Sequence, residues 1–118
     1  MGDQPSYLTG PQAAQKIRDR MADGTLTTSF ETDRGRIMAD VTNGLRAMVM
    51  LLDEPGDRGE HAIDPDAPGE QCGYVLENGQ HDTYANRDTV ALDVALALVE
   101  HLADHGRPSA DVAWEIDR

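Results

Sequence analysis

Residues 73–84 have the sequence Gly-Tyr-Val-Leu-Glu-Asn-Gly-Gln-His-Asp-Thr-Tyr, which is the pattern of a β-hairpin. Tyr74 and Leu76 fall on one face of the first strand, because side chains alternate along a strand. Asn78-Gly79 then supplies a two-residue turn. We predict a type I′ turn there, because Asn and Gly best tolerate positive φ at both central positions. We expect this hairpin to join a sheet formed by the residues before it.

Three upstream segments predict a meander of strands. Residues 25–34 are rich in β-branched side chains, and a tight turn is expected at 33–36. Residues 37–42 alternate in polarity, and an Asn-Gly pair after them gives a second hairpin turn. Residues 45–52 are almost continuously apolar, which predicts a strand at the centre of the sheet.

A helix is predicted near the N-terminus. Thr9 and Gln12 have the spacing of a capping box, in which each side chain bonds the backbone N–H of the other residue. Apolar residues then recur at helical spacing as far as Ala22, and Gly24 is a suitable residue to end the helix. Residues 1–8 are expected to form a flexible arm.

A second helix is predicted from about Val90 to His105, with Asp88 or Thr89 as its cap. Its apolar face is broad, so we expect it to lie across the sheet. A last strand is expected at residues 110–116. The sequence thus predicts one domain over residues 1–118 of the α+β class. It has about six mainly antiparallel strands and two helices, in the order α-β-β-β-loop-β-β-α-β.

The composition limits the class of protein. The chain has 118 residues, of which 22 are acidic and 10 basic, for a net charge of −12. Such a charge repels nucleic acid and anionic membranes and attracts basic partners. General solubility or adaptation to high salt is the alternative interpretation. No apolar run is long enough to span a bilayer, and no signal peptide is visible. The single cysteine, Cys72, suits a reducing cytoplasm and is expected to be a buried or half-buried thiol.

Residues 53–70 are predicted to be a long acidic loop. They contain three prolines and carry a net charge of −6, half of the excess of the whole chain. A loop of this length is usually functional or disordered, so we expect either a binding segment or a solvated connection.

No catalytic site and no metal site are predicted. His101 and His105 lie four residues apart on one helix face, but no third ligand accompanies them. Met38, Met48 and Met50 are expected to fill the core, with an adaptable binding face as the alternative. We therefore expect neither a cofactor nor enzymatic activity.

The order of several short motifs resembles immunity protein family one of bacterial polymorphic toxin systems. The resemblance covers roughly residues 25–118, and one departure is Ala91, where many members have proline. The motifs that carry it are Val41-Thr42-Asn43-Gly44, Leu51-Leu52-Asp53-Glu54-Pro55-Gly56, Gly73-Tyr74-Val75-Leu76, Asn78-Gly79-Gln80, Asp82, Tyr84, Arg87-Asp88-Thr89-Val90, Gly106-Arg107-Pro108 and Val112-x-Trp114-Glu115.

The resemblance implies an antidote that has no catalytic activity and that binds a cognate toxin, commonly of the nucleic-acid deaminase fold. Such a toxin needs positive surface to hold phosphates, and an acidic protein suits that surface. We expect the acids of the loop to steer this basic partner and the hairpin to anchor it. The candidate contact residues are Asp57, Glu60, Asp64, Asp66, Glu77, His81, Asp82 and Tyr84. An acidic binding or scaffold module that mimics nucleic acid is the alternative, and the sequence leaves the oligomeric state open.

Overall fold

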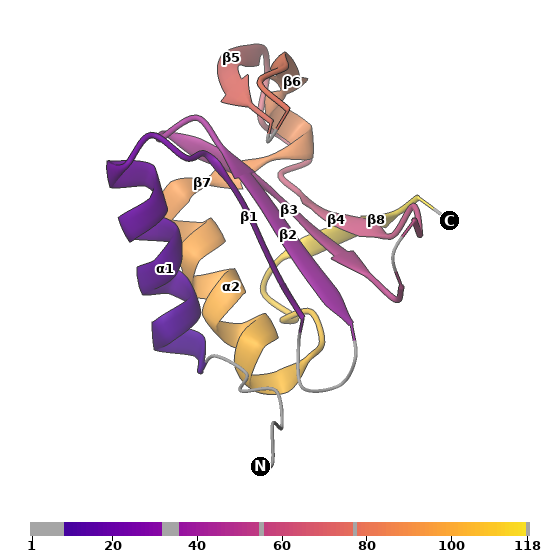
Figure 1. Ribbon diagram of the computed structural model, residues 1–118. Coiled ribbons are helices and arrows are strands. Elements are labelled where there is room, and N and C mark those ends of the chain that lie inside the picture. The colour runs from indigo at the N-terminus through magenta and orange to yellow at the C-terminus, as the bar shows by residue number, and fades with distance from the viewer. Residues whose placement is uncertain (1–8, 32–35, 55, 77, 118) are drawn as a thin grey trace.

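The two helices lie side by side on one face of a six-stranded sheet in the computed structural model (Figure 1). The structure describes residues 9–31, 36–54, 56–76 and 78–117. The helices are α1 (Gly10–Ala22), α2 (Leu92–His105) and the short 3-10 helix η1 (Asn86–Asp88). The strands are β1 (Thr27–Glu31), β2 (Ile37–Thr42), β3 (Arg46–Leu52), β4 (Glu60–Ile63), β5 (Glu70–Val75), β6 (His81–Ala85), β7 (Val90–Ala91) and β8 (Ala113–Ile116). The α+β class with a mainly antiparallel sheet is confirmed.

The start of α1 follows the predicted capping box. The Thr9 hydroxyl accepts from the Gln12 backbone N–H at 3.4 Å, and the Gln12 side chain accepts from the Thr9 N–H at 3.0 Å. The backbone N–H of Gly10 donates to the Asp104 carboxylate of α2 at 2.7 Å. A Cβ at position 10 would lie 2.5 Å from Asp104 Oδ2, so this glycine allows the two helices to approach closely.

Side chains alternate between the two faces of the main sheet. In β3, Val49 and Leu51 are fully buried in the core that the helices cover. Met48 and Met50 therefore point to the opposite face, where both are half-buried. Met38 of β2 pairs with Leu51 and belongs to the core. Core filling is thus confirmed for Met38, whereas Met48 and Met50 lie on the face away from the helices.

The prediction of an unstructured acidic loop over residues 53–70 is wrong in its middle. Residues 60–63 form β4, which pairs with β3 on one side and β8 on the other. The strand is four residues long and lies among prolines, glycines and acids, so its own sequence has little strand pattern. Its hydrogen bonds come from β3, the preceding strand, and from β8, which lies far along the chain, and these partners decide its conformation.

The hairpin of residues 73–84 is confirmed, but it does not join the main sheet. β5 and β6 form a separate two-stranded sheet at one end of the molecule (Figure 1). Side chains, rather than a neighbouring strand, attach it. The Thr27 hydroxyl donates to the Val75 carbonyl at 2.9 Å, and the Asn43 amide donates to the Cys72 carbonyl at 3.1 Å. The ring of Tyr74 is fully buried, so the hairpin is fixed to the body of the protein.

The type I′ prediction for the hairpin turn is also wrong. Gly79 has a φ of 84°, and the register that pairs Val75 with His81 leaves an odd number of residues between the strands, which a two-residue turn cannot have. The Gly79 N–H donates to the Leu76 carbonyl, and the Leu76 N–H donates to the Gln80 carbonyl, both at 2.9 Å. The Asn78 side chain accepts from the Gln80 N–H, which favours a turn with one left-handed residue rather than two.

The second helix begins two residues later than predicted, and neither Asp88 nor Thr89 caps it. Its N-cap is Ala91, because residues 90–91 form β7 and pair with β3 instead. The last strand likewise begins at Ala113 rather than at residue 110. The predicted N-terminal arm at 1–8, residues 32–35 of the first predicted strand and turn, and Glu77 lie outside the described residues. Among the described helices, none has the length and apolar character that a membrane crossing requires.

Candidate functional site

The face of the sheet away from the helices carries a strip of half-buried apolar side chains. We define this open face by Ile37, Ala39, Met48, Met50 and Leu52, which the strand register places on one side of β2 and β3. A monomer normally covers such a strip or uses it for binding. Polar groups border it on β4, where His61 pairs with Met50 and therefore points to the same side.

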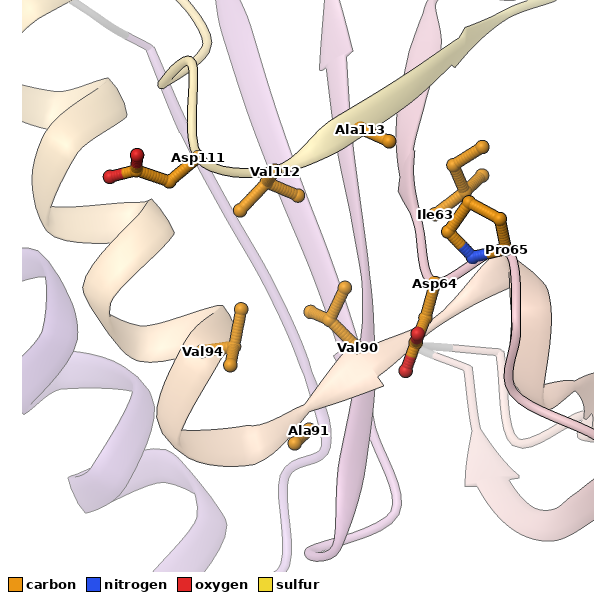
Figure 2. Close-up of a pocket in the computed structure, with 9 residues that line it drawn as sticks. All are labelled: Ile63, Asp64, Pro65, Val90, Ala91, Val94, Asp111, Val112 and Ala113. Carbon is orange, nitrogen blue, oxygen red and sulfur yellow. The ribbon is translucent and has the colours of Figure 1, made fainter.

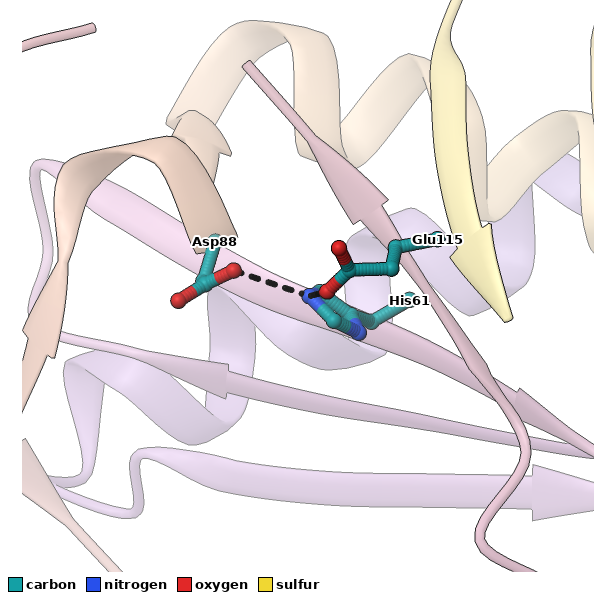
Figure 3. A group of neighbouring side chains, drawn as sticks. All are labelled: His61, Asp88 and Glu115. Atoms are coloured by element: carbon teal, nitrogen blue, oxygen red, sulfur yellow. Dashed lines mark hydrogen bonds and ion pairs between the residues drawn. The ribbon is translucent and has the colours of Figure 1, made fainter. Parts of the chain in front are cut away.

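His61 is the centre of a cluster of carboxylates at this border. Its Nδ1 lies 2.7 Å from Asp117 Oδ2, which follows β8, and its Nε2 lies 3.1 Å from Asp88 Oδ1 of η1. Glu115 of β8 also points toward the ring, with Oε2 3.6 Å from Nε2 (Figure 3). The side chain of His61 is only 10% exposed, so these side chains enclose it.

Arg46 holds η1 in the position that brings Asp88 to His61. Its Nη2 donates to the carbonyls of Asn86 and Thr89 at 3.1 and 3.0 Å, and its Nε donates to the Thr89 hydroxyl at 2.8 Å. The same Nη2 also binds the Asp64 carboxylate at 3.0 Å. One planar guanidinium thus joins β3, the end of β4 and the segment after η1, which a lysine could not do with the same geometry.

The carboxylates favour the charged form of His61. Burial lowers its pKa, but the hydrogen bonds and negative charges of Asp117 and Asp88 outweigh burial and raise the pKa above its ordinary value. Arg87 also faces the cluster, with Nη1 3.2 Å from Asp88 Oδ1 and Nη2 3.8 Å from Glu115 Oε1. Negative charge still dominates, because three carboxylates meet one imidazole and one guanidinium.

The four loop acids predicted to contact a partner do not lie together. Asp57 and Glu60 precede or begin β4, where Asp57 accepts from the Asp53 N–H at 3.0 Å and Glu60 lies 3.8 Å from Arg36. Asp64 and Asp66 follow the other end of β4, and Asp64 is bound to Arg46. Asp66 is the exposed member of the set. Asp57, Glu60 and Asp64 each have a structural partner that the sequence did not predict.

The predicted hairpin contacts lie on β6. His81 is exposed at its start, and Asp82 accepts from the Tyr84 hydroxyl at 2.8 Å. Tyr84 is half-buried, with its ring centroid 4.6 Å from that of Tyr74. Burial and the neighbouring Asp82 carboxylate raise the pKa of Tyr84 to about 12. Cys72 on β5 is exposed, which corrects the prediction of a buried or half-buried thiol.

A search for related proteins gives no identification. No protein-family model, curated protein or solved structure matches the chain. The candidate site therefore depends on geometry alone. Within the described part of the chain, the side chains of His61, Asp88 and Glu115 are the one group of three whose potential metal-ligand atoms converge, all within 4.8 Å of one another.

Sequence reasoning missed this cluster because its members come from three distant segments. One signal was available. Glu115 and Asp117 are two residues apart in a predicted strand and so share a face. Nothing in the sequence placed His61 or Asp88 opposite that face. The histidine pair that the sequence does show, His101 and His105, lies on α2 with its ring centroids 4.5 Å apart.

A groove of about 340 Å³ lies beside the site, between the end of β4, β7 and the segment entering β8 (Figure 2). Val90, Val94 and Val112 line it together with the aliphatic residues around them. Two carboxylates, those of Asp64 and Asp111, also line it, and Asp64 already binds Arg46. The groove therefore combines apolar side chains with acidic ones.

Proposed function

We propose that the protein binds and neutralises a basic toxin domain, in the manner of immunity protein family one, and that the open face of the sheet is the contact surface. The observation that carries the proposal is the juxtaposition of this half-buried apolar strip with the carboxylates around His61. Protein interfaces commonly have an apolar centre and a polar border. An acidic border suits a partner whose own surface evolved to hold phosphates.

The methionines of the strip support a binding function. Met48 and Met50 are half-buried outside the core formed against the helices. Methionine side chains are unbranched and polarisable, so they adapt to the shape of a partner. The partner itself, a deaminase-type toxin, is implied by the motif resemblance.

An enzymatic function has less support. His61 and Asp117 have the arrangement of a general base and the carboxylate that orients it. However, Nε2 of His61 faces Asp88 and Glu115 rather than a hydroxyl or thiol that it could activate. The arrangement therefore lacks a nucleophile at the position where catalysis would need one.

Co-expression with the product of the adjacent gene, as the candidate toxin, tests the proposal. The unaltered protein is expected to restore growth and to co-purify with the toxin in a fixed ratio. The double variant Met48→Lys/Met50→Lys places positive charge in the strip, and we expect it to bind the toxin at least about tenfold more weakly, because it repels a basic partner. Isothermal titration calorimetry measures the change.

The control is Leu45→Lys/Val94→Lys, which makes the same chemical change at two exposed apolar side chains outside the open face. Leu45 is 71% and Val94 is 38% exposed. Circular dichroism and thermal melting establish that both variants fold. Loss of binding by the control alone, or full protection by the Met48→Lys/Met50→Lys variant, places the contact elsewhere.

A further inference from the structure

We propose that His61, Asp88 and Glu115 bind a divalent transition-metal ion such as Zn²⁺, with Asp117 as the residue that orients the imidazole. This inference concerns the isolated protein and does not depend on toxin binding. The three ligand atoms are His61 Nε2 and one carboxylate oxygen each from Asp88 and Glu115 (Figure 3).

Two of the three distances between these atoms suit one shared ion, and all three atoms lie within 4.8 Å of one another. Zn²⁺ binds nitrogen and oxygen ligands at about 2.0–2.2 Å, so two ligands of a tetrahedral site lie about 3.3 Å apart. His61 Nε2 is 3.1 Å from Asp88 Oδ1 and 3.6 Å from Glu115 Oε2, on either side of that value. Three protein ligands leave one position for water or for an atom of a partner.

Asp117 supplies the remaining feature of a metal-binding histidine. Its Oδ2 lies 2.7 Å from His61 Nδ1 and accepts that N–H, which leaves the lone pair on Nε2. The backbone of β4 fixes the other end of the side chain. The ring is buried there, and Met50 is its cross-strand partner on β3. Both nitrogen atoms of His61 therefore have one defined role each.

A protonated His61 cannot donate a hydrogen bond to every carboxylate that converges on it. An imidazolium has two N–H groups, which point to Asp117 and Asp88. Glu115 Oε2, at 3.6 Å from Nε2, receives neither of them. A divalent ion contacts Asp88 and Glu115 together, and beside a neutral imidazole it reduces the formal charge of the three carboxylates from −3 to −1.

The ion is identified by its ligands. One imidazole and two carboxylates suit Zn²⁺ or Mn²⁺ better than Ca²⁺, which prefers oxygen ligands only and more of them. Arg87 does not obstruct the site, because its side chain is 45% exposed and can turn to solvent when the ion enters. The ion reaches the cluster from the border of the open face, where the side chain of Glu115 is also 45% exposed.

Calorimetric titration of the full chain with ZnCl₂ tests the inference. We expect one ion per chain and a higher melting temperature with Zn²⁺, because the ion binds only the folded arrangement. Glu115→Gln and His61→Gln are each expected to weaken binding at least about tenfold. Glu115 is the more informative position, since its exposed side chain can change without disturbing the core. Wild-type affinity in either variant, or no saturable binding by the unaltered chain, overturns the proposal.

The matched control is His101→Gln/His105→Gln, which removes the pair of stacked imidazoles on α2. This variant is expected to keep Zn²⁺ affinity within about twofold. Loss of binding there assigns the ion to α2 and overturns the proposal. For Asp117→Asn we expect about 10- to 100-fold weaker binding. Long-range ¹H–¹⁵N spectra of the Zn²⁺-loaded proteins should then show His61 as a mixture of tautomers in the variant and as the Nδ1–H form in the unaltered protein.

Discussion

At the scale of single residues, Asp40 is the side chain least suited to its surroundings. It lies on β2 with 1% exposure, and neither carboxylate oxygen has a hydrogen-bond partner among the described residues. Thr28, its partner on β1, is bound instead to Arg20 of α1. Burial raises the pKa of Asp40 to about 7, because an ionised carboxylate is costly in an apolar core.

The raised pKa of Asp40 predicts how stability depends on pH. The folded protein keeps the proton up to about pH 7, whereas the unfolded chain loses it near 3.8. The free energy of unfolding should therefore fall as pH rises through this interval, by an amount on the order of 4 kcal/mol, and level off above it. Asp40→Asn removes the titrating group and should flatten this part of the profile. Urea titrations between pH 4 and 8 measure it.

His61 contributes to the same profile at higher pH. Its pKa is also raised in the folded protein, so its stabilising contribution is complete below pH 6.5 and is lost as pH rises through the folded-state value. Asp19→Asn, which removes one exposed carboxylate from α1, is the matched control. A profile for Asp40→Asn that retains the full slope between pH 4 and 7 would contradict the role assigned to Asp40.

At the scale of elements, the junction between β3 and β4 depends on one glycine. Gly59 has a φ of 72°, and a Cβ there would lie 2.6 Å from the Leu51 carbonyl oxygen. Gly59→Ala should therefore separate β4 from β3 and cost more than the about 1–2 kcal/mol of a left-handed alanine alone. Gly56 lies in the same connection, with a φ of 84°, and a Cβ added there would meet no described residue within 4 Å apart from its chain neighbours.

Gly56→Ala thus isolates the backbone cost and is the matched control. Chemical denaturation measures the free energy of unfolding of the two variants. We expect Gly56→Ala to be more stable than Gly59→Ala by at least about 1 kcal/mol. Because β4 carries His61, Gly59→Ala should also weaken Zn²⁺ binding, whereas Gly56→Ala should not. Equal destabilisation by both variants would show that β4 tolerates displacement from β3.

Elements whose conformation is decided locally were predictable from the sequence. The capping box at Thr9 and the Asn-Gly pairs lie within a few residues of the bonds they form, and α1, the meander and the hairpin all follow from such signals. The broad apolar face of α2 likewise predicted its place against the sheet.

Elements that depend on distant partners were not predictable. β4 has four residues and exists because β3 and β8 bind it from both sides. β7 replaces the expected first turn of α2 because Val90 pairs with Ala47 of β3. Both errors explain why the sequence did not predict the His61 cluster. The cluster forms only when residues 60–63 are a strand and η1 is folded over that strand. None of its contacts is local in the sequence.

At the scale of the whole molecule, the net charge of −12 predicts how fast a basic partner associates. Several acids are partly neutralised by the arginines they bind, as Asp64 is by Arg46. Glu54, Asp66 and Glu70 are exposed in the segments that precede and follow β4 in the chain, so we expect them to provide much of the local attraction. The variant Glu54→Gln/Asp66→Asn/Glu70→Gln should associate with the proposed toxin partner several-fold more slowly at low salt, with little change in dissociation.

The control removes the same three charges from the opposite side of the fold, at Asp19, Asp23 and Glu31 on and after α1 and on β1. Both variants have the same net charge, so stopped-flow association over a salt series separates position from total charge. A local field is screened beyond about 10 Å at 0.1 M salt, so the difference between the variants should shrink as salt increases. Equal slowing by the two variants would mean that the overall charge attracts the partner, and that the acids around β4 have no directional role.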